Sequence, residues 1–147
     1  MKSKANIILG LLVLLIGTTV SAQSLKVMTY NIRLDIASDG LNDWSHRKDF
    51  WIAQMQFYVP DVFGVQEATP NQVTDLTQAF ANYVKVGIGR ELEGKGEASC
   101  VFFKKDRFDL LQSNTKRIYE TPNQVSMSWD AACIRLCLYV LKKKKKS

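Results

Sequence analysis

Apolar residues along this chain recur at two spacings that alternate from one segment to the next. Short runs that are continuously or alternately apolar suit buried β-strands, whereas apolar residues three or four positions apart suit helices. We therefore expect one α/β domain with two helices packed on one face of a mixed β-sheet. The predicted strands lie at 25–33, 62–66, 83–87, 100–103, 108–119 and 133–141, and the predicted helices at 45–58 and 70–80.

Each predicted helix carries residues that mark its ends. Ser45 is a plausible N-cap for the first helix, because its hydroxyl can accept a free backbone N–H, and Pro60 follows the end of that helix. Thr69 is the expected N-cap of the second helix, and Pro70 suits the first helical position.

Polar residues end the first two predicted strands. Asn31 lies near the end of the first, and Gln66 and Glu67 end the second. Open α/β sheets build their sites at the carboxyl ends of strands. A carboxylate is a hard oxygen ligand for Mg²⁺, and a neighbouring amide can hold a phosphate oxygen or a water. The pair therefore indicates metal-assisted phosphoester chemistry.

Residues 1–22 have the features of a secretory signal peptide. Lys2 and Lys4 are positive, 7–16 is a short apolar stretch, and small residues precede an expected cleavage after Ala22. The alternative is a membrane anchor, but about ten apolar residues are fewer than the roughly 20 that a span needs. We expect a secreted or periplasmic protein with no transmembrane span in the mature chain.

The net charge of +6 comes from the two ends of the chain. Without Lys2, Lys4 and the lysines at 142–146, the net charge is −1. Nucleic acid therefore remains a possible partner that the charge of the domain does not support. The Lys-rich terminal run at 142–147 could contact nucleic acid or lipid, form a solvated tail, or protect an edge strand. A further reading is that the domain is truncated at this point, and we favour it because a predicted buried strand runs straight into the lysines.

Several segments carry a resemblance to a known family. KVMTYNIRLD, DGLNDWSHRKDF, PDVFGVQEA, GIGRELEGKGE, VFFKKDRFDLL and WDAACIR resemble the N-terminal half of the endonuclease/exonuclease/phosphatase superfamily, in its secreted bacterial branch. The resemblance implies an α/β fold that is half of a four-layer α/β sandwich, with residues 23–141 as a partial domain. Family members are about twice as long.

The resemblance also implies roles for individual residues. Glu67 matches the Mg²⁺ (or Mn²⁺) ligand of the family, and Asn31 matches the asparagine that helps to organise the metal and the phosphate. Arg47 belongs to a loop pattern of the branch, and Glu97 and Arg135 are further candidates for binding the substrate. Arg33 stands where abasic-site nucleases carry an acid, which argues against DNA repair.

Motifs from the second half of the family are missing. The asparagine-threonine-histidine, glycine-aspartate-x-asparagine and serine-aspartate-histidine segments do not occur in this sequence. These segments supply the groups that activate water, and such groups contribute about 10²–10⁴-fold to the rate. Two functions follow: a metal-dependent phosphoesterase that is inactive as this chain, or a non-catalytic secreted module that binds a phosphorylated ligand or a partner.

Overall fold

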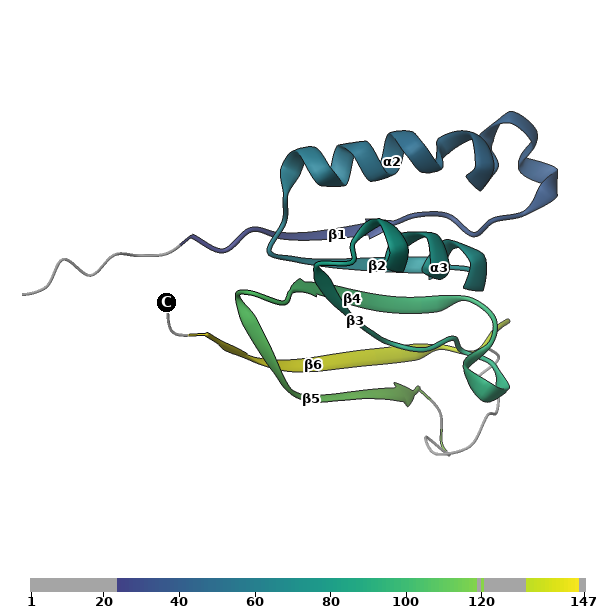
Figure 1. Ribbon diagram of the computed structural model, residues 1–147. Helices are drawn as coiled ribbons and strands as arrows, with labels where there is room; N and C mark the ends of the chain where they lie inside the picture. The colour runs from purple at the N-terminus through teal and green to yellow at the C-terminus, as the bar shows by residue number, and fades with distance from the viewer. Residues whose placement is uncertain (1–23, 119, 121–131, 146–147) are drawn as a thin grey trace, which may run out of the picture.

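The computed structural model describes residues 24–118, 120 and 132–145, which form an α/β structure in three layers (Figure 1). Two helices lie on one face of a four-stranded sheet, and a two-stranded sheet lies on the side away from the helices. The predicted α/β fold with helices on one face is therefore confirmed. The predicted signal peptide at 1–22 and residues 121–131 lie outside the described residues.

The larger sheet is mixed, with strand order β1-β2-β4-β3. β1 and β2 run parallel, while β4 is antiparallel to both β2 and β3. Parallel neighbours end at the same edge of a sheet, so the polar residues at the ends of β1 and β2 are brought together. The strands are β1 (Val27–Asn31), β2 (Val62–Ala68), β3 (Tyr83–Val86) and β4 (Ala98–Lys104).

The two helices are α2 (Trp44–Tyr58) and α3 (Pro70–Ala79). The N-cap of α2 is Asp43 and not Ser45 as predicted, because the Asp43 carboxylate accepts the backbone N–H of His46 and also the hydroxyl of Ser45. Thr69 is the N-cap of α3 with Pro70 first in the helix, as predicted. Short 3₁₀ segments, η1 (Ala37–Asn42) and η2 (Leu92–Gly94), lie in the connecting loops.

Aromatic side chains fill the core between the helices and the larger sheet. Phe63 of β2 stacks on Phe102 of β4 with their ring centroids 4.7 Å apart, and Trp51 of α2 packs edge-on against Phe63. Large rings bury much apolar area, and offset or edge-to-face pairs add further stabilisation. This core holds β1, β2 and β4 against the helices, so the ends of these strands are fixed in space.

The second sheet consists of β5 (Phe108–Arg117) and β6 (Leu136–Lys144) in antiparallel pairing. Phe108 and Val140 from this sheet pack with Val62 and Phe103 of the larger sheet. β6 begins at Leu136, later than predicted, and it continues through Lys144 into the predicted terminal run of lysines.

Lys142 explains how that lysine run can form a strand. Its ammonium group lies 4.9 Å from the ring centre of Phe108 and 5.5 Å from that of Phe103. A lysine stem can cover apolar surface while its charge interacts with an aromatic face. Burial lowers the pKa of Lys142, in keeping with this partly enclosed position.

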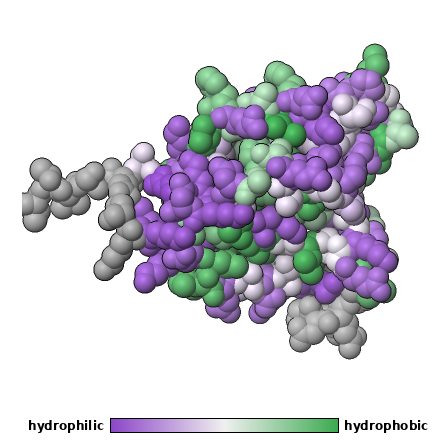
Figure 2. Space-filling model, in the orientation of Figure 1, coloured by the Kyte–Doolittle hydropathy of each residue, from purple (hydrophilic) through white to green (hydrophobic). Residues whose placement is uncertain are grey.

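Part of the surface remains apolar and open. Figure 2 shows apolar side chains gathered near the second sheet, where Leu111 is 57% and Leu141 49% exposed. Val27 on the edge strand β1 is 63% exposed. Within the described residues, neither helix has the length and apolar character that crossing a membrane requires.

Candidate functional site

Glu67 reaches the site because β2 has an irregularity at its end. Phe63 and Val65 point toward the helices, and strict alternation would send Glu67 the same way. Instead, the pairing with β4 shifts between Val65 and Ala68, and Ala68 takes the buried position on the helix side. Glu67 has a φ of +61°, which is the left-handed region that a glutamate seldom adopts. Bulges of this kind redirect side chains and are common next to active sites.

Asn31 contacts Glu67 directly. Asn31 is the last residue of β1 and pairs with Gln66 in the parallel ladder. Its side-chain amide donates to Glu67 Oε1 at 2.6 Å, and its Oδ1 accepts the backbone N–H of Arg33 at 2.9 Å. A backbone N–H needs an acceptor, so this second contact fixes which end of the amide faces Glu67. The two predicted metal-site residues therefore lie together, with Asn31 orienting the carboxylate.

The chain that follows Asn31 is anchored by both helices. Arg47 of α2 donates to the carbonyl oxygens of Ile32, Arg33 and Asn42, the last two at 3.0 and 2.7 Å. Gln72 of α3, which is fully buried, donates to the same Arg33 carbonyl at 2.8 Å. These contacts hold the Arg33 N–H in place for Asn31.

The predicted substrate-binding role of Arg47 does not agree with this placement. Its guanidinium group is engaged by three backbone carbonyls, and Arg47 is not among the residues that line the pocket beside Glu67. An arginine offers five donors in a rigid fork, which suits it to joining three carbonyls of one loop. We therefore assign Arg47 a positioning role.

Replacing Arg47 with lysine tests this assignment. A single ammonium group cannot span the three carbonyls, so we expect the free energy of unfolding to fall by about 2 kcal/mol. The affinity for Mn²⁺ should fall as well, because Asn31 loses the support of a fixed Arg33 N–H. Chemical denaturation and Mn²⁺ titration by electron paramagnetic resonance measure the two effects.

Lys48→Gln is the matched control on the same helix. It removes one ion pair, to Asp75 at 3.4 Å, and should cost less than about 1 kcal/mol. If Arg47→Lys kept the original stability but lost affinity for phosphate, the predicted substrate-binding role would be restored.

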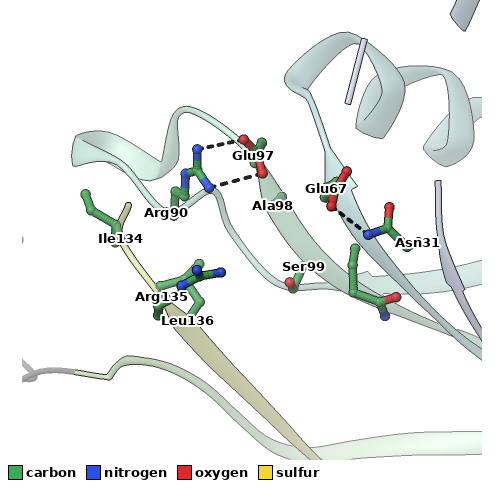
Figure 3. A pocket seen from close by; sticks show the side chains of 10 residues that line it. Asn31, Glu67, Arg90, Glu97, Ala98, Ser99, Ile134, Arg135 and Leu136 are labelled. Atoms are coloured by element: carbon green, nitrogen blue, oxygen red, sulfur yellow. Dashed lines mark hydrogen bonds and ion pairs between the residues drawn. The ribbon is translucent and has the colours of Figure 1, made fainter. Parts of the chain in front are cut away.

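A polar pocket of about 230 Å³ opens beside Glu67 (Figure 3). Glu97 and Arg135, which the sequence analysis gave as candidates for binding the substrate, both line this pocket. The structure also brings in Arg90, which the sequence analysis missed although Arg90 lies in the GIGRELEGKGE segment. The lining residues are Asn31, Gln66, Glu67, Arg90, Glu97, Ala98, Ser99, Ile134, Arg135 and Leu136.

Glu97 forms an ion pair with Arg90 within the pocket. Arg90 Nη2 lies 2.6 Å from Glu97 Oε1, and Nη1 donates to Oε2 at 3.1 Å. In Figure 3 this pair and the Asn31–Glu67 pair lie at opposite ends of the pocket, with Ser99 between them. Glu97 neutralises the charge of Arg90, and Arg135 is a second arginine in the lining of the pocket.

The donor set partly suits a hard cation. Within the described residues, no three histidine, cysteine, aspartate or glutamate side chains form a metal-binding group. Mg²⁺ nevertheless often binds through one or two carboxylates, several waters and the phosphate of a substrate. Glu67 is such a carboxylate, and its orientation is fixed by Asn31. The only histidine, His46, lies at the start of α2, where its Nδ1 is 2.9 Å from Asp43.

No protein-family model and no curated protein matches this chain, but solved structures do. An endonuclease/exonuclease/phosphatase family protein from Bacteroides thetaiotaomicron is 33% identical over 85% of this chain, with a TM-score of 0.79. Its counterpart from Bacteroides vulgatus is 35% identical over 82%, with a TM-score of 0.74. A mannosyl-6-phosphatase from B. thetaiotaomicron is 33% identical over 82%, with a TM-score of 0.77.

The alignments cover only part of each solved structure. The alignments take in 46%, 47% and 46% of the B. vulgatus protein, the B. thetaiotaomicron family protein and the mannosyl-6-phosphatase. This chain therefore spans about half the length of the solved structures that it matches. Over the matched region, the identity to the two family proteins is 35% and 33%, with TM-scores of 0.74 and 0.79. The chain therefore belongs to the endonuclease/exonuclease/phosphatase superfamily.

Proposed function

We propose that this chain carries part of the active site of a metal-dependent phosphoester hydrolase. The observation that supports this most is Glu67, which has a strained backbone, is bonded to Asn31 and opens on a polar pocket. A left-handed glutamate costs about 1–3 kcal/mol, and such strain is concentrated at functional sites. The relatedness to phosphatases agrees with this assignment.

In this proposal, three residues that line the pocket have separate roles. Glu67 would hold Mg²⁺ or Mn²⁺ through a carboxylate that Asn31 orients, and Arg135 in the pocket lining would add positive charge near the phosphate. A divalent cation bound at Glu67 supplies polarisation of the phosphoryl oxygen and neutralisation of the charge that develops there. A phosphate bound in the pocket would lie among residues that include both Glu67 and Arg135.

The lining residues do not include a histidine or an aspartate that could activate water. Glu97 is paired with Arg90, and His46 is bonded to Asp43 at the start of α2. When several groups act together in catalysis, the enzyme usually loses most of its rate enhancement if one of them is missing. We therefore propose that the 147-residue chain by itself binds phosphate with Mg²⁺ but turns over slowly.

Phosphomonoesters are the substrate class that we favour. The mannosyl-6-phosphatase is one of the matched structures, and the net charge of −1 outside the two ends of the chain does not favour nucleic acid.

The apolar segment at 7–16 further supports the proposal that the protein is exported. A non-catalytic module that binds a phosphorylated ligand remains the second candidate, because the lining of the described pocket holds no histidine or aspartate that could activate water.

Two measurements on residues 23–147 test the proposal. Binding of inorganic phosphate is followed by ³¹P NMR with and without Mg²⁺, and hydrolysis of p-nitrophenyl phosphate and of bis-p-nitrophenyl phosphate is followed with the B. thetaiotaomicron mannosyl-6-phosphatase as positive control. We expect Mg²⁺-dependent phosphate binding and at least about 10²-fold slower hydrolysis than the control.

Each outcome decides between the candidates. Phosphate binding without any hydrolysis would favour the non-catalytic module. Hydrolysis as fast as that of the control would show that this chain has its own means of activating water. A lack of Mg²⁺-dependent phosphate binding would contradict both candidates.

A further inference from the structure

The loop between β3 and β4 holds Arg90 and Glu97 side by side. Gly89 pairs with Ala98 as an isolated antiparallel bridge, and the Arg90 N–H donates to the Glu97 carbonyl at 3.0 Å. The loop turns back tightly at this point, because a Cβ at Gly89 would lie 2.1 Å from the Lys95 carbonyl oxygen. The backbone therefore fixes the two side chains as cross-strand neighbours at one end of the pocket.

The ion pair is bidentate and partly enclosed. Each oxygen of Glu97 meets one terminal nitrogen of Arg90, at 2.6 and 3.1 Å, and the side chains are 22% and 24% exposed. Each terminal nitrogen of a guanidinium group carries two N–H donors, and each carboxylate oxygen has two lone pairs. The pair therefore retains donors and acceptors for a ligand while its net charge is zero.

This combination suits hydroxyl groups. A hydroxyl both donates and accepts, so adjacent hydroxyls of a ligand match adjacent acceptors and donors of the Arg90–Glu97 pair. A phosphate would need positive charge that Glu97 cancels, and an acyl chain would need an apolar wall. Ser99 and Gln66 add a hydroxyl and an amide to the lining, and the residues that line the pocket include no aromatic ring for stacking a base.

The two ends of the pocket therefore differ in chemistry. We propose that the Arg90–Glu97 pair binds the hydroxyl groups of a sugar or polyol phosphate whose phosphate lies at Glu67. This inference rests on the proposed function, because it takes the phosphate to be held at the Asn31–Glu67 end. It assigns Arg90 and Glu97 to recognition of the organic part of the substrate and not to the phosphate.

Two phosphates with six carbon atoms each, one rich in hydroxyls and one without any, provide the test. Calorimetric titration of residues 23–147 in Mg²⁺ compares mannose 6-phosphate with n-hexyl phosphate, which has the same number of carbon atoms, and with inorganic phosphate. Hydrogen bonds to charged groups contribute about 1.5–3 kcal/mol each, so we expect mannose 6-phosphate to bind about tenfold or more tightly than hexyl phosphate. In Glu97→Gln this preference should be lost.

Glu97→Gln also separates recognition from a purely structural role. It leaves Arg90 positive, so hexyl phosphate and inorganic phosphate should bind as tightly as before or more tightly, while the sugar preference disappears. A variant that only disturbed the fold would weaken all three ligands together. The matched control is Glu93→Gln in the same loop, which breaks a pair with Lys95 that is more than 70% exposed and lies outside the pocket lining.

The failure of this inference can be told from the failure of the proposed function. If inorganic phosphate binds with Mg²⁺ but mannose 6-phosphate gains nothing over hexyl phosphate, the polyol assignment is wrong and the phosphate site stands. The same conclusion follows if Glu97→Gln keeps the sugar preference. If inorganic phosphate does not bind, the proposed function fails and the polyol assignment falls with it.

Discussion

Replacing Glu67 with glutamine should lower the affinity for Mn²⁺ by at least about tenfold and remove Mg²⁺-dependent phosphate binding. Glu67 is the single carboxylate at the Asn31 end of the pocket, and a neutral amide is a much poorer ligand for a hard cation. Glutamine retains an oxygen that can accept from Asn31, so the fold should persist. Electron paramagnetic resonance of Mn²⁺ and ³¹P NMR of phosphate measure the two losses.

Asp49→Asn is the control for this experiment. Asp49 is an exposed carboxylate of α2, and its removal changes the net charge by the same amount as Glu67→Gln. Equal Mn²⁺ affinity in the original chain and in Glu67→Gln, at unchanged melting temperature, would place the cation elsewhere. A drop of the same size in Asp49→Asn would reduce the effect to general electrostatics.

The main elements of the fold were predictable from the sequence because their signals are local. Helix α3 is an example. Thr69 is its N-cap and Pro70 its first residue, and threonine and proline are favoured at these two positions. The closeness of Asn31 and Glu67 was also predictable, because each ends an apolar strand and parallel strands end at one edge.

The details of the site depended on contacts that a sequence pattern does not contain. Alternation along β2 would turn Glu67 toward the helices, and only the bulge before Ala68 turns it to the pocket. Arginine commonly binds phosphate, but the guanidinium group of Arg47 donates to three backbone carbonyls instead. Arg90 became part of the site because the loop folds back at Gly89, which the spacing of Arg90 and Glu97 alone does not show.

The N-cap of α2 and the end of β6 were also hidden from the sequence pattern. Ser45 and Asp43 are both good N-cap residues, and the choice between them depends on which side chain reaches the free N–H groups of α2. The lysines after residue 141 extend β6 because Lys142 finds two aromatic rings, Phe103 and Phe108, across the sheets. Such partners are far apart in the sequence, so the local pattern ended the predicted strand at residue 141.

Asp61 links parts of the fold that lie at the other end of β2 from the site. Its carboxylate is buried, with 3% of the residue exposed, and accepts the backbone N–H of Lys26 at 2.9 Å. It also pairs with Lys104 at 3.0 Å and with Arg107 at 2.5 Å. Burial alone would raise the pKa of Asp61, but these hydrogen bonds outweigh it and lower the pKa to about 2.

Replacing Asp61 with asparagine should therefore destabilise the protein by about 3 kcal/mol at pH 7. Removing the charge leaves Lys104 and Arg107 partly buried without their partner, and the total stability of a small domain is only about 5–15 kcal/mol. Because the folded pKa lies below the unfolded value of about 3.9, the stabilisation by the Asp61 charge is complete above about pH 4 and is lost as the pH falls toward 2. Urea denaturation at several pH values between 7 and 2.5 measures the difference between the two chains.

The difference in stability between the original chain and Asp61→Asn should thus shrink steadily below pH 4. Asp109→Asn is the matched control, because Asp109 pairs with Lys145 at 3.3 Å but is 57% exposed, and its loss should cost less than about 1 kcal/mol at any pH. A difference for Asp61→Asn that stayed constant from pH 7 to 2.5 would mean that shape, and not charge, is what Asp61 contributes. Since Asp61 lies at the opposite end of β2 from Glu67, the variant that remains folded at pH 7 should still bind Mn²⁺ with its original affinity.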